Sequence, residues 1–362
     1  MRGFIVGLVI GLAVGVVLAV SLPPVGDTPP GEGAKSAGSG AAPLAWKMGS
    51  AFPAGMAPMG ALAKQTAQAI TMASSGTIEV ELRDPGASVP ALDLFDAVSS
   101  ATIDAAFSSP AYWVDKAPAL QLFAGVPFGP GPQEFLAWFL EGGGRKAFEQ
   151  LYRRRNIHAL PCGLAIPGGG GWFKGEVAGP GAFSGLRVAV SGLAAKVLAK
   201  LGARPVLLAA GDIRQALKQG SIDGAVVSVP SADRSLDIHL EAKNYYFPGW
   251  QRQAGILELM INLGRWRALD ADQRRHIERV CAANLGISLA RGEAAQFSAL
   301  KGLVIDGVEV RRWSRQVTDA LRAAWAEVLA AELARDKDFK RIWEKLKRFR
   351  EEYAIWAELG YL

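Results

Sequence analysis

FSGLRVAV, residues 183–190, combines a loop, a glycine turn and a short apolar strand that we predict at Leu186–Val190. The only charge in this strand is Arg187. A guanidinium is costly to bury unless it is paired and hydrogen-bonded, and its planar fork fits a carboxylate with two parallel hydrogen bonds. Two interpretations of Arg187 follow: an internal ion pair with an Asp or Glu elsewhere in the chain, or a clamp for the carboxylate of a ligand.

The chain that follows this strand alternates between helical and strand patterns. Apolar spacing predicts a helix, a strand, a helix and a strand at Leu193–Leu201, Pro205–Leu208, Asp212–Gln219 and Ile222–Ser228. An order of βαβαβ is typical of a mostly parallel sheet with helices on both faces.

The same order of elements occurs earlier in the chain. The two copies also have a similar local sequence, VSSATIDA at 98–105 and LKQGSIDG at 217–224. A duplicated α/β module predicts a two-lobe fold. Ligands of such sheets bind outside the carboxyl ends of the strands and between lobes. The elements expected in the first copy are Trp46–Ser50, Met56–Ala73, Ile78–Leu82, Leu92–Ser100 and Ile103–Phe107.

The rest of the chain predicts one more helix between the modules, a return strand and several long helices. We therefore expect lobe 1 mainly at 44–170, lobe 2 mainly at 171–255, and a return strand with long helices completing both lobes at 256–362. The long helices also offer surfaces for a homodimer. The expected elements are helices Gln133–Tyr152, Asp270–Leu300, Arg315–Arg335 and Asp338–Leu359, an aromatic turn Asn244–Gly255, and strands Ile256–Ile261 and Val304–Val310.

The first 22 residues form a targeting segment. One positive residue, Arg2, precedes an uninterrupted apolar run at residues 4–22. The run is longer than a usual signal-peptide core and close to the roughly 20 residues that span a bilayer. Cleavage after Ser21 and retention as a membrane anchor are both compatible with it. Residues 23–43, rich in Pro, Gly, Ser and Ala, are predicted to be a flexible linker.

Composition excludes several classes of function. The formal net charge of +6 over 362 residues is spread along the chain, without basic runs interleaved with aromatics, so we expect no nucleic-acid binding. The three histidines have no metal-ligand spacing, and no nucleophile motif or pair of catalytic carboxylates is evident, so we expect no enzyme. The only two cysteines, Cys162 and Cys281, lie too far apart in sequence to predict whether they pair.

Several long motifs resemble one family, the extracytoplasmic solute-binding subunits of TRAP transporters, in the branch that binds 2-oxo acids such as pyruvate. The resemblance implies two α/β lobes that close over a small organic acid, no chemistry, and delivery to a membrane permease. It also implies that Arg187 grips the substrate carboxylate. The motifs are LFDAVSSATIDAAF (94–107), AYWVDKAPALQLFAGVPFG (111–129), AWFLEGGG (137–144), GGWFKGEV (170–177), GLRVAV (185–190), LGARPVLLAAGDIRQALKQGSIDGA (201–225) and AKNYYFPGWQ (242–251).

The chain departs from this branch where the branch holds a metal cation against its ligand. The family's Gln falls on Gly168, its Glu-Trp pair on Val226-Val227, its second Glu on Arg252 and a nearby Asn on Leu164. A hard cation needs oxygen ligands. We therefore predict that no metal is bound.

The reversal of charge at Arg252 suggests a hypothesis. Together with Arg187 it would place two fixed positive charges in the pocket, suited to a ligand with two anionic groups or to a 2-oxo acid whose carbonyl meets Arg252. The alternative is that Arg252 points to solvent and that the pocket is more apolar than usual. Further candidate ligand-binding residues are Tyr112 (or its neighbour Ala111), Trp172, Gly168, Val227, Phe247 and Trp250.

Two functions remain open at this point. The first is an extracytoplasmic binding protein that captures a small organic acid for a TRAP-type secondary transporter, in the periplasm or tethered there by residues 4–22. The second is a membrane-anchored sensor or scaffold that uses the same fold without a transport role. Neither requires a cofactor.

Overall fold

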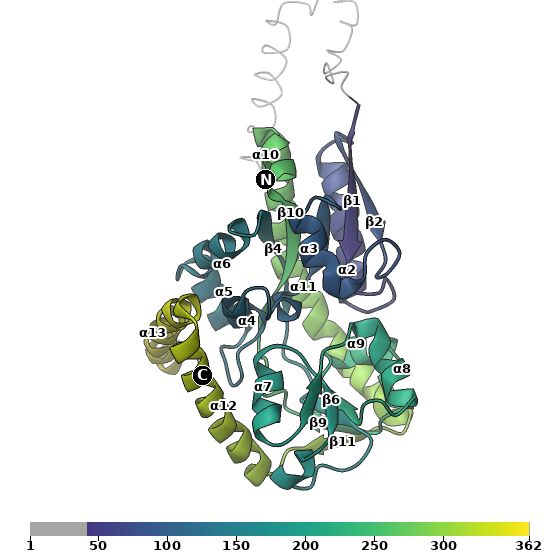
Figure 1. Cartoon of the computed structure of the whole chain (residues 1–362), viewed down its shortest axis with the longest axis vertical. Coiled ribbons are helices and arrows are strands. Elements are labelled where there is room, and N and C mark those ends of the chain that lie inside the picture. The colour runs from purple at the N-terminus through teal and green to yellow at the C-terminus, as the bar shows by residue number, and fades with distance from the viewer. Residues whose placement is uncertain (1–41, 362) are drawn as a thin grey trace, which may run out of the picture. The chain divides into compact units, whose positions relative to one another are not determined.

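The computed structural model describes residues 42–361. The predicted leader and nearly all of the predicted linker lie outside the described residues. Among the described residues, no helix is both long and apolar enough to cross a bilayer. The account below concerns the unit that begins at Pro43 (Figure 1).

The first sheet has the strand order β2-β1-β3-β10-β4. β1 pairs in parallel with both β2 and β3, whereas β10 is antiparallel to β3 and β4. The return strand β10 therefore lies between β3, the last strand of the βαβαβ module, and β4, which comes from the segment between the two modules. The bounds are β1 Leu44–Ser50, β2 Ile78–Arg83, β3 Ala105–Ser108, β4 Ile157–Ala165 and β10 Gly255–Asn262.

The second sheet has the order β11-β9-β5-β8-β6-β7. β6 is parallel to β7 and β8, as the βαβαβ pattern predicts, and β5 runs antiparallel to its neighbours β8 and β9. The two sheets confirm the predicted two-lobe α/β fold. The bounds are β5 Gly171–Phe173, β6 Arg187–Ala189, β7 Arg204–Val206, β8 Gly224–Ala225, β9 Asn244–Phe247 and β11 Glu309–Arg312.

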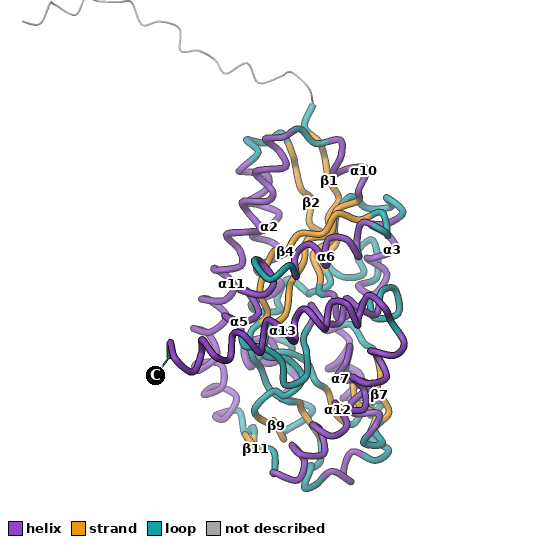
Figure 2. Tube along the Cα trace, turned by 90° about the vertical axis from the view of Figure 1, so that its left-hand side faces the viewer, coloured by secondary structure: helices purple, strands orange, loops and turns teal. Residues whose placement is uncertain are grey.

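One 35-residue helix, α11 (Ala271–Ile305), connects the two lobes. It packs against β4 and α2 (Met59–Ala73) of the first lobe and against α9 (Pro230–Ser235) of the second (Figure 2). A reciprocal capping box between Asp270 and Gln273 satisfies amide groups at its start. The other helices are α3 Leu94–Ser99, α4 Gln121–Ala124, α5 Pro132–Leu140, α6 Gly144–Arg153, α7 Gly192–Lys200, α8 Ile213–Lys218, α10 Leu263–Ala268, α12 Arg315–Arg335 and α13 Lys337–Gly360.

The structure corrects three predicted elements and adds one strand that was not predicted. The expected helix Gln133–Tyr152 is broken into α5 and α6 at Gly143, whose φ of +85° no ordinary helix contains. β4 was not predicted, because a strand buried on both faces shows no alternation and a proline interrupts it. The expected strand Val304–Val310 is a helix end up to residue 305, and the expected aromatic turn begins with β9.

A disulfide joins Cys162 in β4 to Cys281 in α11. The sequence left this pairing open, because only the packing of α11 across β4 brings the two residues together. The bond links α11 to the edge strand β4 of the first sheet.

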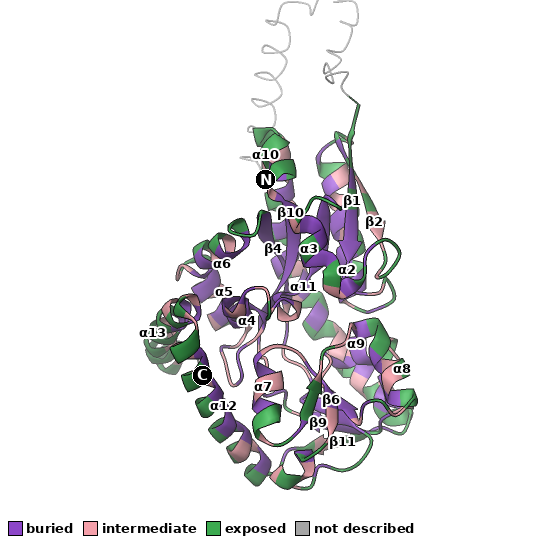
Figure 3. Cartoon of the chain, in the orientation of Figure 1, coloured by how far each residue is buried: buried purple, intermediate pink, exposed green. Residues whose placement is uncertain are grey.

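A carboxyl group lies inside the first lobe. Glu258, in β10, is fully buried, and so is every other residue of β10 (Figure 3). Trp113 Nε1 donates to Glu258 Oε1 at 2.6 Å, and the Tyr152 hydroxyl donates to Oε2. Burial without a cationic partner raises the pKa of Glu258 to about 8.

We expect Glu258 to make the protein less stable as the pH rises from 6 to 8. The unfolded carboxyl loses its proton near pH 4.5, whereas the folded one keeps it to about pH 8, so over this range the folded state binds more protons. Glu258→Gln keeps the shape of the side chain and cannot ionise. Its melting temperature should therefore fall less between pH 6 and 8 than that of the wild type. Equal falls in a thermal-denaturation series would contradict the assignment.

Candidate functional site

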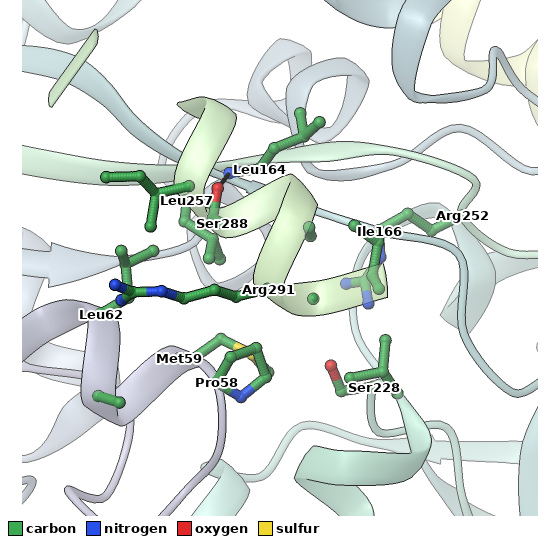
Figure 4. Close-up of a pocket in the computed structure, with 15 residues that line it drawn as sticks. Pro58, Met59, Leu62, Leu164, Ile166, Ser228, Arg252, Leu257, Ser288 and Arg291 are labelled. Carbon is green, nitrogen blue, oxygen red and sulfur yellow. Dashed lines mark hydrogen bonds between the residues drawn. The ribbon is translucent and has the colours of Figure 1, made fainter. Parts of the chain in front are cut away.

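Three small adjoining cavities lie between the two lobes, and Arg252 lines all of them. Their volumes are about 70, 70 and 50 Å³. We call them the α2–α11 cavity (Figure 4), the central cavity and the α4–α7 cavity. The central cavity is lined by Phe52, Met56, Met59, Ser109, Ala111, Tyr112, Ala165, Ala189, Val190, Ser191, Leu208, Ala210, Ile213, Val226, Val227, Ser228, Arg252 and Leu257.

The central cavity lies where parallel strands of both sheets end. Phe52 follows β1 and Ser109 follows β3 in the first lobe, while Val190, Leu208 and Val226 follow β6, β7 and β8 in the second. Carboxyl ends of parallel strands meet at one edge of a sheet, so loops from several strands converge there. The two duplicated modules therefore face each other with their ligand-binding edges.

Arg252 reaches the cavities from the turn that precedes β10. Its aliphatic stem passes closely over Gly125 and Gly255, where a Cβ atom would lie 2.6 Å from Arg252 Cγ and 3.3 Å from Cδ, respectively. Only glycine leaves this path open at residue 125, whose φ of +149° also disfavours other residues. The local backbone is thus shaped to carry the arginine into the protein.

The Arg252 guanidinium has no ion pair and no hydrogen bond to any residue that the structure describes. Its Nε is buried without an acceptor. Burial lowers the pKa of Arg252, and the nearby Asp233 carboxylate opposes that effect at longer range. The residue as a whole is half-buried. Because a partly desolvated cation without a partner is costly, the arrangement favours an anionic group in the cavities.

Asp233, in α9, organises the side of the site behind Arg252. Its Oδ2 accepts from Trp172 Nε1 at 2.7 Å and from the Tyr245 hydroxyl at 2.8 Å, and its Oδ1 accepts from the Ser228 amide at 3.1 Å. Burial raises the pKa of Asp233 to about 6, against the effect of these donors. The carboxylate is therefore ionised at neutral pH and fixes the loop after β8, which lines the cavities.

The structure contradicts the prediction that Arg187 is the carboxylate clamp. Its Nε and Nη2 donate to Asp223 Oδ2 and Oδ1 at 3.0 and 2.7 Å, and it lines none of the three cavities. The internal ion pair is the interpretation that the structure supports. The reason is position: Arg187 begins β6, two residues before Ala189, and a strand advances roughly 3.3 Å per residue toward the cavity.

Three of the other predicted residues meet at the cavities. Arg252 lines all three, Tyr112 lines the central one, and Val227 lines the central and α4–α7 cavities together with Ala111. Burial raises the pKa of the Tyr112 hydroxyl to about 12, so it stays protonated. The alternative that Arg252 points to solvent is wrong.

Four predicted residues line none of these cavities. Gly168 packs against the Ser228 carbonyl, where a Cβ atom would lie only 1.9 Å from the oxygen. Trp172 is buried and stacks on Tyr245, whose ring Phe247 also contacts. Trp250 is buried against Phe128. These residues support the walls rather than form them.

Sequence reasoning missed several polar groups of the central cavity. Ser109, Ser191 and Ser228 each lie just beyond a strand end, and all three line it. The rule that ligands bind at the carboxyl ends of parallel strands would have indicated them. Serine is too common in loops for the residue type to be a signal.

The lining does not fit a hard metal cation. None of the residues that line the three cavities is Asp or Glu, and Arg252 brings a positive charge. Residues 42–361 contain no group of three or more His, Cys, Asp or Glu side chains placed to hold a metal ion. Calcium and similar ions prefer carboxylate and carbonyl oxygens.

Residues 49–336 match the model of the bacterial extracellular solute-binding proteins, family 7. The chain belongs to this family. Family 7 proteins are extracytoplasmic substrate-binding proteins rather than enzymes, so the strand-end cavities between the lobes are the expected place for a solute.

Individual proteins that resemble this chain agree with the family assignment. The chain is 29% identical to the monocarboxylate 2-oxoacid-binding periplasmic protein of Nostoc sp. over 88% of this chain and 87% of that protein. A TRAP solute-binding protein of Bordetella bronchiseptica, with calcium and picolinate, superposes with a TM-score of 0.85 at 28% identity over 88% and 95% of the chains. One from Pseudoalteromonas atlantica, with sodium and pyruvate, gives 0.83 at 27% identity over 88% and 97%.

We expect the family 7 protein to become more stable without ligand when Arg252 is replaced by Met. The change removes a half-buried cation without a partner and keeps most of the stem, which should stabilise the empty protein by up to about 1 kcal/mol. Arg187→Met is the matched control, because that arginine is paired and partly exposed. Thermal denaturation without ligand should show a rise of the melting temperature for the first variant only. A fall for Arg252→Met would contradict the view of Arg252 as an uncompensated charge.

Proposed function

We propose that this family 7 protein captures a small organic acid, such as a 2-oxo acid, for a TRAP-type secondary transporter. The observation that carries the proposal is the half-buried guanidinium of Arg252, which has no partner among residues 42–361 and lines all three cavities. A carboxylate would accept two parallel hydrogen bonds from it. The relatives named above bind pyruvate, picolinate or 2-oxo acids, which supports the same ligand class here.

The remaining groups of the central cavity suit the rest of such a ligand. The hydroxyls of Tyr112, Ser191 and Ser228 supply hydrogen bonds for a carbonyl or hydroxyl oxygen, and Val226 and Val227 supply apolar walls. Since Arg187 is engaged by Asp223, the pocket offers one buried cation rather than the two that the sequence suggested. A single carboxylate is therefore the anionic group for which the pocket is suited.

We further propose that the ligand binds without a metal ion. The Bordetella and Pseudoalteromonas relatives hold calcium or sodium with their ligands. In this chain the positive charge of Arg252 occupies the same cavity that binds the acid, and carboxylates are missing from the cavity walls. The guanidinium takes over the charge neutralisation that a cation supplies.

We infer that the protein performs no reaction on its ligand. The cavity walls carry no nucleophile with an adjacent base and no pair of carboxylates. The ligand would be passed unchanged to membrane permease subunits. The predicted tether at residues 4–22 stays a prediction, which the N-terminal sequence of the exported protein would test.

The second predicted partner is another copy of the chain. The C-terminal half of α13 exposes Ile355, Trp356 and Leu359, while its first half is packed (Figure 3). We propose that this end of α13 contributes to a homodimer, and the dimer formed by the Bordetella relative supports it. Sedimentation velocity of the exported protein measures the oligomeric state.

Arg252→Ala should abolish or strongly weaken carboxylate binding. Truncating one partner of a buried charged pair costs about 2–5 kcal/mol, which is on the order of a 30-fold to 5,000-fold loss of affinity. Arg187→Ala is the control and should bind as the wild type does, because Arg187 is outside the cavities. Isothermal titration with pyruvate and longer 2-oxo acids measures both. Equal binding by Arg252→Ala and wild type would exclude Arg252 as the clamp.

Removal of metal should leave the affinity unchanged. Titration of the wild-type protein in EDTA, and again with added calcium, should give the same dissociation constant, because the charge of Arg252 is covalently fixed. A loss of binding in EDTA that calcium restores would show that a cation is required and would refute the metal-free site.

A further inference from the structure

The α2–α11 cavity is almost entirely apolar and extends away from the central cavity. It lies between α2, the end of β4 and the middle of α11 (Figure 4). A cavity with such walls favours hydrocarbon over polar groups. Its apolar side chains are Met59, Leu62, Leu164, Ile166, Leu257 and Ile287.

Away from Arg252, the serine on the α11 wall and the Ser228 amide already have hydrogen-bond partners. The Ser288 hydroxyl accepts from the Leu164 amide at 2.8 Å and donates to the Leu285 carbonyl at 3.1 Å. The Ser228 amide donates to Asp233. The wall formed by α11 is therefore apolar on its cavity side, although it contains Ser288.

The cavity offers no second buried cation at its far side. Figure 4 shows Arg291 beside Leu62, across the cavity from Arg252. Arg291 is exposed, and its Nη1 donates to Gln65 Oε1. Its guanidinium is therefore hydrogen-bonded to Gln65 and screened by water.

Arg252 joins this cavity to the central one. Five residues line both cavities, and a carboxylate on the guanidinium would stand at their junction. The carbon chain of the ligand then has an apolar route past Met59, a flexible side chain that adapts to neighbouring shapes. The shared residues are Met59, Ala165, Ser228, Arg252 and Leu257.

We infer that the ligand is a monocarboxylate with a short aliphatic tail, and that the tail occupies the α2–α11 cavity. This inference rests on the proposed function, because it takes the carboxylate to be held by Arg252. It excludes the ligand with two anionic groups that the sequence allowed. 4-Methyl-2-oxopentanoate represents this class of ligand. Pyruvate, which has no tail, and 2-oxoglutarate, which has a second carboxylate, are the comparison compounds.

The first measurement compares these three acids by isothermal titration with the wild-type protein. Each buried methylene contributes about a fourfold gain in affinity, so the three extra carbons of 4-methyl-2-oxopentanoate should tighten binding roughly tenfold to a hundredfold over pyruvate. 2-Oxoglutarate should bind more weakly than 4-methyl-2-oxopentanoate, because its second carboxylate would lie among apolar side chains.

The second measurement uses a variant whose new side chain fills the α2–α11 cavity from its rim. Ala61 is exposed on α2 and lines the α2–α11 cavity, so Ala61→Phe adds a ring there without disturbing the buried side of the helix. The ratio of affinities for 4-methyl-2-oxopentanoate and pyruvate should fall at least tenfold. Gln68→Phe is the control, because it adds the same ring to an exposed position two turns along α2 that lines none of the three cavities.

The outcomes separate this inference from the proposed function. If pyruvate or 2-oxoglutarate binds most tightly, or if Ala61→Phe keeps the wild-type affinity ratio, the tail site is overturned while carboxylate capture stands. If the wild type binds none of the three acids, the proposed function is overturned and the inference with it. If Arg252→Ala binds the acids as tightly as the wild type does, the clamp is overturned together with the tail site that depends on it, while capture of an organic acid stands.

Discussion

The positive charge of Arg252 inside the protein is the constraint on which the site depends. Water hydrates a guanidinium strongly, so a buried one without a partner raises the free energy of the empty protein. An anion that entered the cavities would relieve this cost, so the proposed acid would gain binding energy at Arg252. The same feature disfavours a metal cation in that place, because two positive charges would repel each other without a carboxylate between them.

The surrounding structure keeps that charge in position from several directions. Glycines at 125 and 255 leave a path for the stem, and the strand ends of two sheets enclose the head. Asp233 lies behind, held by Trp172 and Tyr245, and supports the arginine without pairing with it. A direct ion pair between Asp233 and Arg252 would satisfy the guanidinium and remove the reason for an acid to bind. Arg187 shows that outcome, because Asp223 already occupies its fork.

Much of the fold was predictable because its elements have local signals. The βαβαβ modules follow from apolar periodicity, and the long helices α11, α12 and α13 follow from uninterrupted helical spacing. β4 was missed because full burial removes the alternation on which strand prediction relies. Of the candidate site, Arg252, Tyr112 and Val227 were found and Arg187 was misplaced. The residue types indicated an arginine as the candidate carboxylate clamp, but two arginines fitted the chemistry, and only Arg252 lines the cavities.

The sequence by itself determined the family and the duplicated α/β plan. Those are properties of local pattern and residue type. Only the tertiary structure decided which arginine is free, that Cys162 meets Cys281, and that an apolar cavity opens beside the charge. The physical reason is that the partner of a buried charge and the shape of a cavity are set by segments far apart in the chain. Asp223 lies 36 residues from Arg187, with which it pairs, and α11 forms one wall of the α2–α11 cavity by packing against distant elements. No local sequence pattern encodes either contact.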